Sequence, residues 1–529
     1  MKTFLILNFL LINFTIAFAQ FAPDHYNLFN EKYNLNKINS ASPLSNTITD
    51  IIIIGDTVWL GTSRGISLSI DNGTTWTNFY GSPDFGTDNI ASIGYYNGIF
   101  WCATAKSTDV SGETYPEGTG LKFTTDLGLT WESIPQSLDA DSDTLEQYGI
   151  NQIDALPVTV GINNLAYDMA FTPNTIWITT FAGGLRKVSI SALMIDQNTK
   201  WQRVVIPPDF LNSISPDDTL SFCLSPVGGN FCSSGNLNHR VFSVVAANDS
   251  TVYVGTANGI NKSSNANDQY PEWVKFNATN QNQPISGNFI TALGYNQLSQ
   301  TVWASTWKAD GETEFYGVSS SEDGGITWNT FLHDERPHNF GFINDDVMVA
   351  TDNGIFRSSD LGHSWLLPGA IIDAETGLKL NATSFYSAGS FHNNIWIGST
   401  NGLARLQETP GRIWQGTWKI YLASQPVESN SETYCSPNPF NPHVDDPIKF
   451  SYSTSGIVEN VTIRIFDFGF NYLRTVIQNA VRNLDIDSPP IDYWDGRDDS
   501  GVYVPNGVYF YRIDVGDKDP VYGKILVMQ

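Results

Sequence analysis

The chain has 529 residues and a formal net charge of −26, with 28 lysines and arginines against 54 aspartates and glutamates. Such a surface repels phosphate backbones and anionic lipid, which disfavours nucleic acids and membrane surfaces as partners. Only 16% of residues are charged and 13% are aromatic, with 44 glycines and 25 prolines. This composition favours many short strands joined by tight turns over long amphipathic helices, so we expect an all-β protein with several packed cores.

The first residues have the pattern of a cleaved signal peptide. Lys2 gives a short positive region, an apolar stretch covers 4–16, and Ala17 and Ala19 place small residues before a cleavage site at Gln20. We therefore expect residues 1–19 to be removed on export to the cell surface or medium. The apolar stretch is too short for a membrane anchor and no second one follows, so we expect no membrane span after cleavage.

Export permits disulfide bonds, and the chain has four cysteines. Cys223 and Cys232 bracket a loop-like stretch and are predicted to pair. Cys102 lies in a predicted strand and Cys435 in a predicted linker, and neither has an obvious partner. No two cysteines have the spacing of zinc ligands, and we expect neither a metal nor another cofactor.

Seven segments of one pattern organise most of the chain. The second residue is aromatic in six of them, the fourth is small or threonine, and the fifth always carries a hydroxyl. They are residues 58–62, 100–104, 176–180, 252–256, 302–306, 347–351 and 395–399. Each is typical of a β-strand, and a unit of about 45 residues with several strands is typical of a β-propeller. We predict a seven-bladed β-propeller over residues 20–428, with large insertions in two of the intervals.

A second motif, S/T-x-D-x-G-x-S/T-W, follows four of these segments at a fixed offset. Its aspartates, glycines and tryptophans are Asp71, Gly73 and Trp76; Asp126, Gly128 and Trp131; Asp323, Gly325 and Trp328; and Asp360, Gly362 and Trp365. The aspartate can accept backbone N–H bonds, the glycine supplies positive φ, and the tryptophan can fill the space between sheets, as a hairpin turn requires. The motif resembles the Asp-box, or bacterial neuraminidase repeat, of sialidase-like propellers. The resemblance implies a structural role, and a calcium loop would need more carboxylates nearby.

The repeat stops near Ser429, and a different pattern follows the Pro-Asn-Pro-Phe-Asn-Pro stretch at 437–442. Alternating strands are predicted at 448–452, 461–466, 507–513 and 524–528, with Trp-Asp-Gly-Arg-Asp at 494–498. This combination resembles the FlgD-like immunoglobulin-like domain and the C-terminal sorting domains of type IX secretion substrates. The resemblance implies a small β-sandwich at 429–529 that engages the secretion machinery or the cell surface. An accessory sandwich without a sorting role is the alternative.

The sequence contains no common catalytic motif. It lacks H-E-x-x-H, G-x-S-x-G, P-loop and C-x-x-C patterns. The propeller arginines do not match the arginine triad with which sialidases grip a carboxylate. Other glycosidases use two carboxylates, and the 54 acidic residues cannot be sorted by sequence. A polysaccharide-degrading hydrolase is therefore the alternative to a non-catalytic function.

Length differences between the units indicate where a ligand would bind. The second and fifth units are longer between their second and third strands, and the stretches 132–160 and 202–240 should emerge at the same end of the propeller. Elaborated loops on a rigid scaffold usually carry recognition. The candidate ligand-binding residues there are Tyr115, Phe181, Trp307 and Tyr316, beside the acids Asp109, Glu113, Asp139, Asp141, Asp310 and Glu312. We predict a non-catalytic interaction or carbohydrate-binding module for an extracellular glycan or protein, with ordinary solvated loops as the alternative.

Overall fold

The computed structural model describes residues 42–82, 84–309, 311–423, 433–436, 438–443, 447–454, 457–483 and 492–529. The chain divides into two compact units, with the boundary between Ala423 and Ser424. Among the described residues the helical elements are α2 (Ile190–Ile195) and a 3-10 turn at Leu237–His239, and the other regular elements are strands. The all-β prediction is confirmed. The predicted signal peptide lies outside the described residues, so its cleavage stays a prediction.

Among its described residues, the first unit contains seven sheets that follow one another in chain order and an eighth, small sheet that is described below. The first has β1 (Ile48–Ile54), β2 (Thr57–Thr62), β3 (Gly65–Ser69) and β4 (Thr77–Phe79), and the second has β5 (Asn89–Tyr96), β6 (Ile99–Val110), β7 (Glu113–Thr124) and β8 (Glu132–Ile134). The third has β11 (Asp168–Thr172), β12 (Thr175–Thr180), β13 (Gly184–Ser189) and β14 (Gln202–Arg203). The fourth has β17 (Val241–Ala246), β18 (Val252–Thr256), β19 (Gly259–Ser263), β20 (Trp273–Phe276) and the added β15 (Ser213–Ile214).

Three further sheets complete the series of seven. The fifth has β21 (Phe289–Asn296), β22 (Thr301–Trp307), β23 (Gly317–Ser321) and β24 (Asn329–Phe331), and the sixth has β25 (Pro337–Ile343), β26 (Asp346–Thr351) and β27 (Gly354–Ser358). The seventh has β28 (Phe385–Phe391), β29 (Asn394–Ser399), β30 (Leu403–Glu408) and β31 (Gly416–Tyr421). Each predicted repeat segment lies in the second strand of its sheet.

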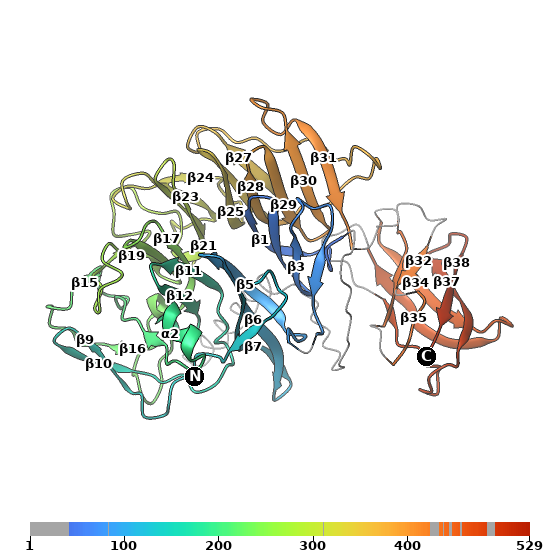
Figure 1. The fold of residues 1–529 in the computed structure, drawn as a ribbon, viewed down its shortest axis with the longest axis horizontal. Coiled ribbons are helices and arrows are strands. Elements are labelled where there is room, and N and C mark those ends of the chain that lie inside the picture. The colour runs from blue at the N-terminus through green and yellow to red at the C-terminus, as the bar shows by residue number, and fades with distance from the viewer. Residues whose placement is uncertain are drawn as a thin grey trace. The chain divides into compact units, whose positions relative to one another are not determined.

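The first strands of the seven sheets form a closed ring. They contact one another in the order β1, β5, β11, β17, β21, β25 and β28, and β28 contacts β1. In Figure 1 the first sheet, in blue, stands beside the last, in brown and orange. A ring of sheets closed in this way is a β-propeller. Two hydrogen bonds also join the N-terminal and C-terminal ends of the propeller. The Thr47 hydroxyl donates to the Thr400 carbonyl at 3.2 Å, and the Ala423 N–H donates to Asn46 at 2.7 Å.

The fifth position of the repeat carries a hydroxyl because that group closes the turn into the third strand. In all seven sheets it donates to the carbonyl of the following repeat glycine, at 2.8–3.3 Å: Thr62 to Gly65, Thr104 to Gly120, Thr180 to Gly184, Thr256 to Gly259, Thr306 to Gly317, Thr351 to Gly354 and Ser399 to Gly402. The second position is buried in every sheet, for instance at Trp59 and Trp396. The repeat is therefore explained by two requirements of every sheet, a hydroxyl that closes the turn and a buried side chain in the core.

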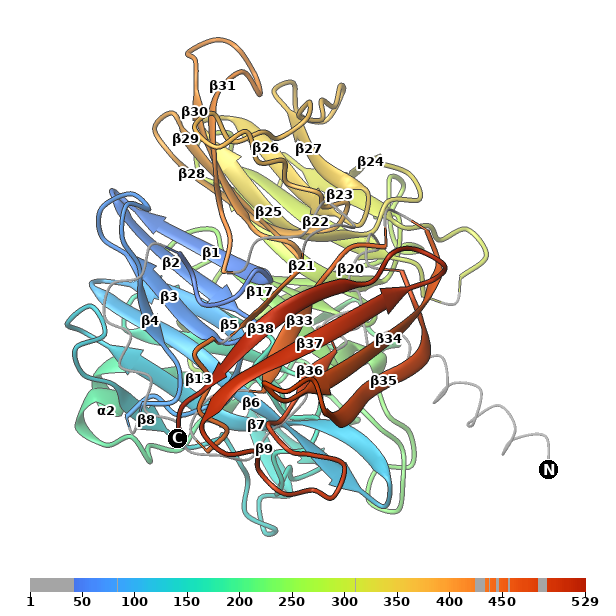
Figure 2. The ribbon, with the colours of Figure 1, turned by 90° about the vertical axis from the view of Figure 1, so that its right-hand side faces the viewer.

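The second unit consists of two sheets around one hydrophobic core. The first has β32 (Tyr434–Ser436), β33 (Ile448–Ser451) and β36 (Tyr493–Trp494), and the second has β35 (Tyr472–Arg482), β34 (Glu459–Phe466), β37 (Gly507–Val515) and β38 (Val521–Val527), which Figure 2 shows side by side. Side chains of both sheets, including Phe450, Trp494, Ile463 and Tyr511, share that core. Cys435 was expected in a linker and instead lies buried in β32, because its side chain belongs to this core. The unit is a β-sandwich, and its kinship with FlgD-like domains stays a prediction.

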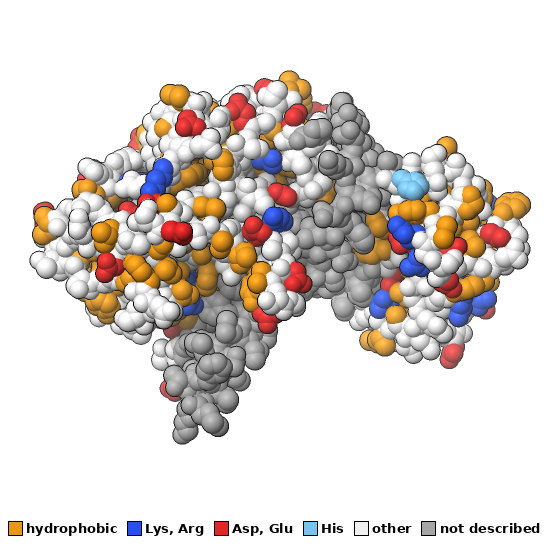
Figure 3. All heavy atoms as spheres, turned by 90° about the horizontal axis from the view of Figure 1, so that it is seen from below, with side chains coloured by type: hydrophobic (Ala, Val, Ile, Leu, Met, Phe, Trp, Pro, Cys, Tyr) orange, Lys and Arg blue, Asp and Glu red, His pale blue; other side chains and the backbone are white. Residues whose placement is uncertain are grey.

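The surface of the first unit reflects the acidic composition. In Figure 3 acidic and hydrophobic side chains are spread over the face of the propeller, and basic side chains are few. Within the described part of the chain, no helix combines the length and the apolar character that crossing a membrane requires.

Candidate functional site

The two ends of the propeller carry different connections. Neighbouring strands are antiparallel in the seven sheets of the ring, for instance in β1 to β4. The turns between second and third strands therefore share one end with the connections between sheets, and we call this the loop end. The turns between third and fourth strands lie at the opposite end, which we call the box end. The long β6–β7 hairpin, the turn at 308–316 and the stretches 135–167 and 204–240 all belong to the loop end, as the lengths of the units predicted.

The four motif turns at the box end satisfy their own polar groups. In the first, the Asp71 carboxylate accepts hydrogen bonds from the Ser69 hydroxyl at 2.8 Å, from the Thr75 N–H at 2.8 Å and from the Thr75 hydroxyl at 2.7 Å. The Ser69 oxygen in turn accepts from the Gly73 N–H at 2.7 Å. The turns of Asp126, Asp323 and Asp360 repeat these bonds. Bonds from the hydroxyl and N–H of Ser364 lower the pKa of Asp360 to about 2.

The motif turns also pack against the preceding sheet. Trp76 of the first sheet lies 6.1 Å from Trp396 and 5.7 Å from Tyr421 of the seventh, between ring centroids. A Cβ at Gly73, where φ is +82°, would come within 2.5 Å of the Trp396 ring and of the Tyr421 hydroxyl oxygen. The other three motif tryptophans contact aromatic rings of the sheet before them, Trp131 with Phe79, Trp328 with Phe276 and Trp365 with Phe331. This geometry fits a structural role for the motif.

Cations on third strands link neighbouring sheets at the box end. Lys262 lies 5.5 Å above the Tyr253 ring and donates to the Gly324 carbonyl of the next sheet at 2.9 Å. Arg405 lies 5.5 Å above Trp396 and donates to the Asn72 carbonyl of the first sheet. Each of these two stacked cations therefore donates to a carbonyl of the next sheet.

Trp307 is not an exposed loop residue, contrary to expectation. Strand β22 continues one residue beyond the repeat segment and ends at Trp307, which is only 3% exposed. Its indole N–H donates to the Pro337 carbonyl at 3.1 Å. The indole is therefore buried in the propeller and is not an exposed side chain to which a ligand could bind.

The other three predicted residues are partly exposed at the loop end. Tyr115 lies on β7, because the insertion in this unit extends the β6–β7 hairpin instead of forming a loop, and its hydroxyl bonds to the Glu113 carboxylate. Phe181 follows β12, with the Arg240 guanidinium 5.2 Å above its ring. Tyr316 precedes β23 and lies 5.9 Å from Trp307. The structure thus joins Trp307 to Tyr316 and places Tyr115 on a separate hairpin, while Asp310 lies outside the described residues.

Three residues that sequence analysis missed complete a cluster around Trp307 and Tyr316. The Arg336 guanidinium lies 4.8 Å above the Tyr316 ring and 5.9 Å from that of Trp307. His338 Nε2 lies 2.7 Å from Asp352 Oδ1, and the imidazole is 6.2 Å from the Trp307 ring. Although burial opposes ionisation, the bond with His338 holds the pKa of Asp352 below its usual range.

A β-bulge turns His338 toward this cluster. The register of β25 and β26 shifts between Pro337 and Asn339, so His338 is the extra residue. A bulge re-aims the side chain of the added residue. The same shift occurs in the first strands of five other sheets, and the added residue is aromatic in two of them, Phe242 in β17 and Tyr386 in β28. Rings therefore line up along the loop end, with centroid distances of 4.7 Å for Phe242–Phe289, 6.3 Å for Phe289–Trp307 and 4.9 Å for His338–Tyr386.

Arg336 differs from the buried Arg357 in what its guanidinium contacts. Arg357 forms ion pairs of 2.7 Å with both Asp346 and Glu408. Within the described part of the chain, the half-buried Arg336 guanidinium contacts the two rings and has no hydrogen bond or ion pair. Its planar group is thus oriented, with its N–H donors available.

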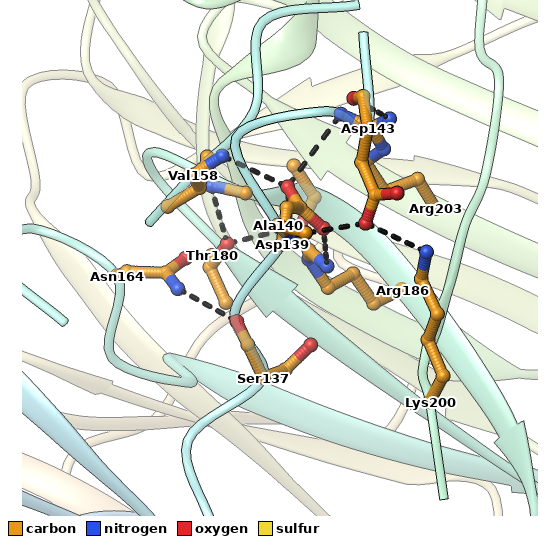
Figure 4. Close-up of polar contacts among 12 residues, drawn as sticks. Ser137, Asp139, Ala140, Asp143, Val158, Asn164, Thr180, Arg186, Lys200 and Arg203 are labelled. Atoms are coloured by element: carbon orange, nitrogen blue, oxygen red, sulfur yellow. Dashed lines mark hydrogen bonds and ion pairs between the residues drawn. The ribbon is translucent and has the colours of Figure 1, made fainter. Parts of the chain in front are cut away.

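One acid expected beside the ligand is instead buried in an ion-pair network, drawn in Figure 4. Asp139 accepts two hydrogen bonds of 2.8 Å from Arg186, and Arg203 lies 3.5 Å away. Although burial opposes ionisation, the Arg186 pair holds the pKa of Asp139 below its usual range. Arg203 also donates to the Asp143 carbonyl at 2.6 Å. The network fastens the stretch 132–160 to the third sheet, and Asp139 is unavailable to a ligand.

The two long stretches meet in a small sheet at the loop end. It consists of β10 (Asn151–Ala155) between β9 (Leu145–Tyr148) and β16 (Cys223–Leu224). A disulfide joins Cys223 to Cys232, with their Cα atoms 5.8 Å apart, whereas Cys102 and Cys435 are free and buried. No group of three or more histidine, cysteine or acidic side chains in the described segments could hold a metal ion.

No protein-family model and no curated protein matches this sequence. Among solved structures, PorZ, a surface component of the type-IX secretion system of Porphyromonas gingivalis, is 14% identical with a TM-score of 0.39, over 90% of this chain and 64% of that one. An ancestral GH74 enzyme is 12% identical with a TM-score of 0.48, over 91% of this chain and 63% of that one. The WD40 β-propeller domain of Doa1 is 12% identical with a TM-score of 0.37, over 70% of this chain and 95% of that one. The chain spans less than two thirds of the first two, and these likenesses concern the fold alone.

Proposed function

We propose that this protein is an exported binding protein of the cell surface or medium. Its signal peptide directs export, a seven-bladed propeller of the Asp-box type holds a glycan at its loop end, and the C-terminal sandwich serves secretion or surface attachment. The observation that carries the ligand site is the Arg336 guanidinium, which two aromatic rings orient and no described residue satisfies.

Ring stacking explains why this guanidinium suits a ligand. A cation above an aromatic face is held by the ring quadrupole. The planar Arg336 guanidinium therefore loses little conformational freedom when it bonds to a ligand. Tyr316 is half-buried and keeps part of its ring accessible. Aromatic anchors and arginines are the residues that most often dominate binding energy at an interface.

The charges around Arg336 favour a neutral glycan. Glu335 and Asp352 flank the arginine, and the Asn353 amide donates to Glu335 at 3.0 Å. These acids disfavour an anionic ligand, whereas carboxylates and a guanidinium together supply acceptors and donors for neighbouring sugar hydroxyls. Tyr316, which is partly exposed, offers a ring on which a sugar can stack.

Two acids of the loop end, Asp352 and Asp139, do not suit the role of a catalytic proton donor. A glycosidase of the two-carboxylate type needs one acid that stays protonated to donate to the leaving group. Asp352 is held by His338 and Asp139 by Arg186, and both pKa values lie below the usual range. Neither acid is suited to donate a proton near neutral pH.

Binding to a glycan array by the mature protein tests this proposal. We expect Arg336→Gln and Tyr316→Ala to weaken binding to the best neutral glycan at least tenfold, a loss of about 1.4 kcal/mol or more. The matched control is Arg412→Gln, an exposed arginine in the β30–β31 turn of the box end, which should bind like the parent. Equal binding by all variants would contradict the site, and release of reducing sugar would contradict a non-catalytic role.

The proposed role of the sandwich has its own test. Deleting residues 429–529 should leave a folded propeller that is retained in the periplasm. The control is the full chain with Val481→Ser, an exposed position of β35 that should not alter export. Arrival of the truncated protein at the cell surface would contradict the sorting role.

A further inference from the structure

The outer face of the β35–β34–β37–β38 sheet carries aromatic and basic side chains. Along β34, Ile463 and Ile465 enter the core, so Arg464 and Phe466 lie on the opposite face. The register aligns Phe466 with Phe510 and Lys524 in one row. It aligns Arg464 with Arg512 and Tyr522 in the next row. The outer face of a sandwich is normally polar, so a row of phenylalanines there needs an explanation.

The turn between β34 and β35 folds a further ring over this face. The Asp467 carboxylate accepts from the N–H groups of Gly469 and Asn471, both at 2.8 Å, and so shapes the turn. Phe470 has a φ of 60°, a conformation uncommon for a residue with a side chain. Its ring stacks on Phe510, with centroids 4.7 Å apart and planes within 10°. The turn is thus built to present Phe470 above the sheet.

These residues line an open hollow of about 480 Å³, which we call the aromatic hollow; its lining is Phe466, Phe470, Phe510, Arg512, Tyr522, Gly523 and Lys524. Its volume lies in the range of sites that take a small ligand or a side chain. Phe470 is 57% exposed and Tyr522 53% exposed. Covering them would remove apolar surface from water, which favours a ligand with an apolar part.

The polar groups at the hollow are cations. Arg512 donates to Asp514 at 2.8 Å and lies 5.9 Å from the Tyr522 ring. The exposed Lys524 ammonium has no hydrogen bond or ion pair with any described residue. Figure 3 shows basic and hydrophobic side chains close together on this unit, although the whole chain has a net charge of −26.

We propose that the aromatic hollow binds a peptide of a partner protein in which an apolar side chain lies beside a carboxylate. Phenylalanine rings accept the apolar side chain, and the Lys524 ammonium complements the charge of the carboxylate. A sugar fits less well, because its hydroxyls would lose water against three phenylalanines that offer no hydrogen bond. The site is separate from the loop end and does not depend on the glycan proposed there.

Calorimetric titration of the full mature chain with acetyl-Ala-Leu-Phe tests the proposal, in the free carboxylate form and as the amide. We expect the carboxylate to bind and the amide to bind at least tenfold more weakly. Lys524→Gln should weaken the carboxylate at least threefold and leave the amide unchanged. Phe470→Ala should weaken both peptides at least tenfold.

Two controls keep the test independent of folding. Phe468→Ala removes a ring of the same turn that is 74% exposed and does not line the hollow, so it should bind like the parent. Lys524→Gln changes an exposed side chain and should keep the parent melting temperature. Equal affinity for carboxylate and amide, no heat from either peptide, or parent-like binding by Phe470→Ala would each overturn the proposal.

Discussion

The two ends of the propeller use the same chemistry to different effect. At the box end, Lys262 stacks on a tyrosine and its ammonium reaches a carbonyl of the next sheet. At the loop end, Arg336 stacks on Tyr316 and its guanidinium bonds to no described residue. The Lys262 contact links two sheets, whereas the Arg336 guanidinium keeps its N–H donors for the ligand that we propose.

The comparison also extends to the acids of the two ends. Each motif aspartate at the box end has its bonds within one turn, and the pattern recurs in four sheets. At the loop end, Asp139 and Asp352 depend on arginine or histidine from another strand. The repeated motif aspartates stabilise turns that several sheets share, whereas the contacts of Asp139 and Asp352 each occur at one place in the propeller.

The largest effect should come from Trp307, which belongs to the wall although it lies at the loop end. Trp307→Ala should lower the unfolding free energy by about 3–5 kcal/mol, as Trp59→Ala should, because each deletes a buried indole. Tyr115→Ala, on the exposed part of the β6–β7 hairpin, should change it by less than about 0.5 kcal/mol. Denaturant unfolding of the three variants measures this. An unfolding free energy of Trp307→Ala equal to that of the parent would contradict a role of the Trp307 indole in the propeller core.

The two ends should also respond to pH with opposite sign. Asp168, which begins β11 near the loop end, has its pKa raised to about 7 by burial, and the charge of Asp50 adds to this. The folded state then holds a proton that the unfolded state releases near pH 4, so stability should fall as the pH rises from about 4 to about 7. The motif acids Asp323 and Asp360, with pKa values of about 2, act in the opposite direction and lose their contribution as the pH falls from about 4 to about 2.

Asp168→Asn tests this sign. The variant should gain on the order of 1–3 kcal/mol over the parent at pH 8 and little at pH 4, since the neutral amide avoids the cost of a buried charge. Unfolding by denaturant at several pH values measures the difference. A gain that is equal at pH 4 and pH 8 would mean that the carboxyl group does not titrate in this window.

The smallest of the stability effects should come from a single box turn. Asp71→Ala removes the acceptor for Thr75 and Ser69, a capping-type loss of about 1–2 kcal/mol. The other three turns are intact, so the fold should persist. Thermal melting with Asp71→Asn as the conservative control measures the loss. A melting temperature of Asp71→Ala equal to that of the parent would contradict a structural role of the motif.

Much of the scaffold could be predicted because its signals are local. The aromatic second position, the hydroxyl fifth position and the S/T-x-D-x-G-x-S/T-W turn are each explained by contacts within one or two sheets. The site could not be predicted in this way. Arg336, His338 and Asp352 meet Trp307 and Tyr316 only when β22, β25 and β26 assemble, and a bulge of one residue decides where His338 points.

Two expectations about single residues were wrong, each for its own reason. Trp307 was expected in a loop because the unit is longer after Thr306, and β22 in fact continues by one residue. Asp139 was expected at the surface, and its partner Arg186 lies 47 residues further along the chain, where no local pattern connects them. Alternation and turn chemistry are visible in a sequence, whereas ion pairs between distant strands are not.

The most direct test of the central claim compares one variant from each end in the same two assays. Arg336→Gln and Asp71→Ala would each be measured for binding to the array-selected glycan and for thermal melting. We predict that Arg336→Gln loses at least tenfold in affinity with an unchanged melting temperature, and that Asp71→Ala melts earlier with unchanged affinity. Lost binding in Asp71→Ala together with parent-like binding in Arg336→Gln would place the ligand at the box end and contradict the account.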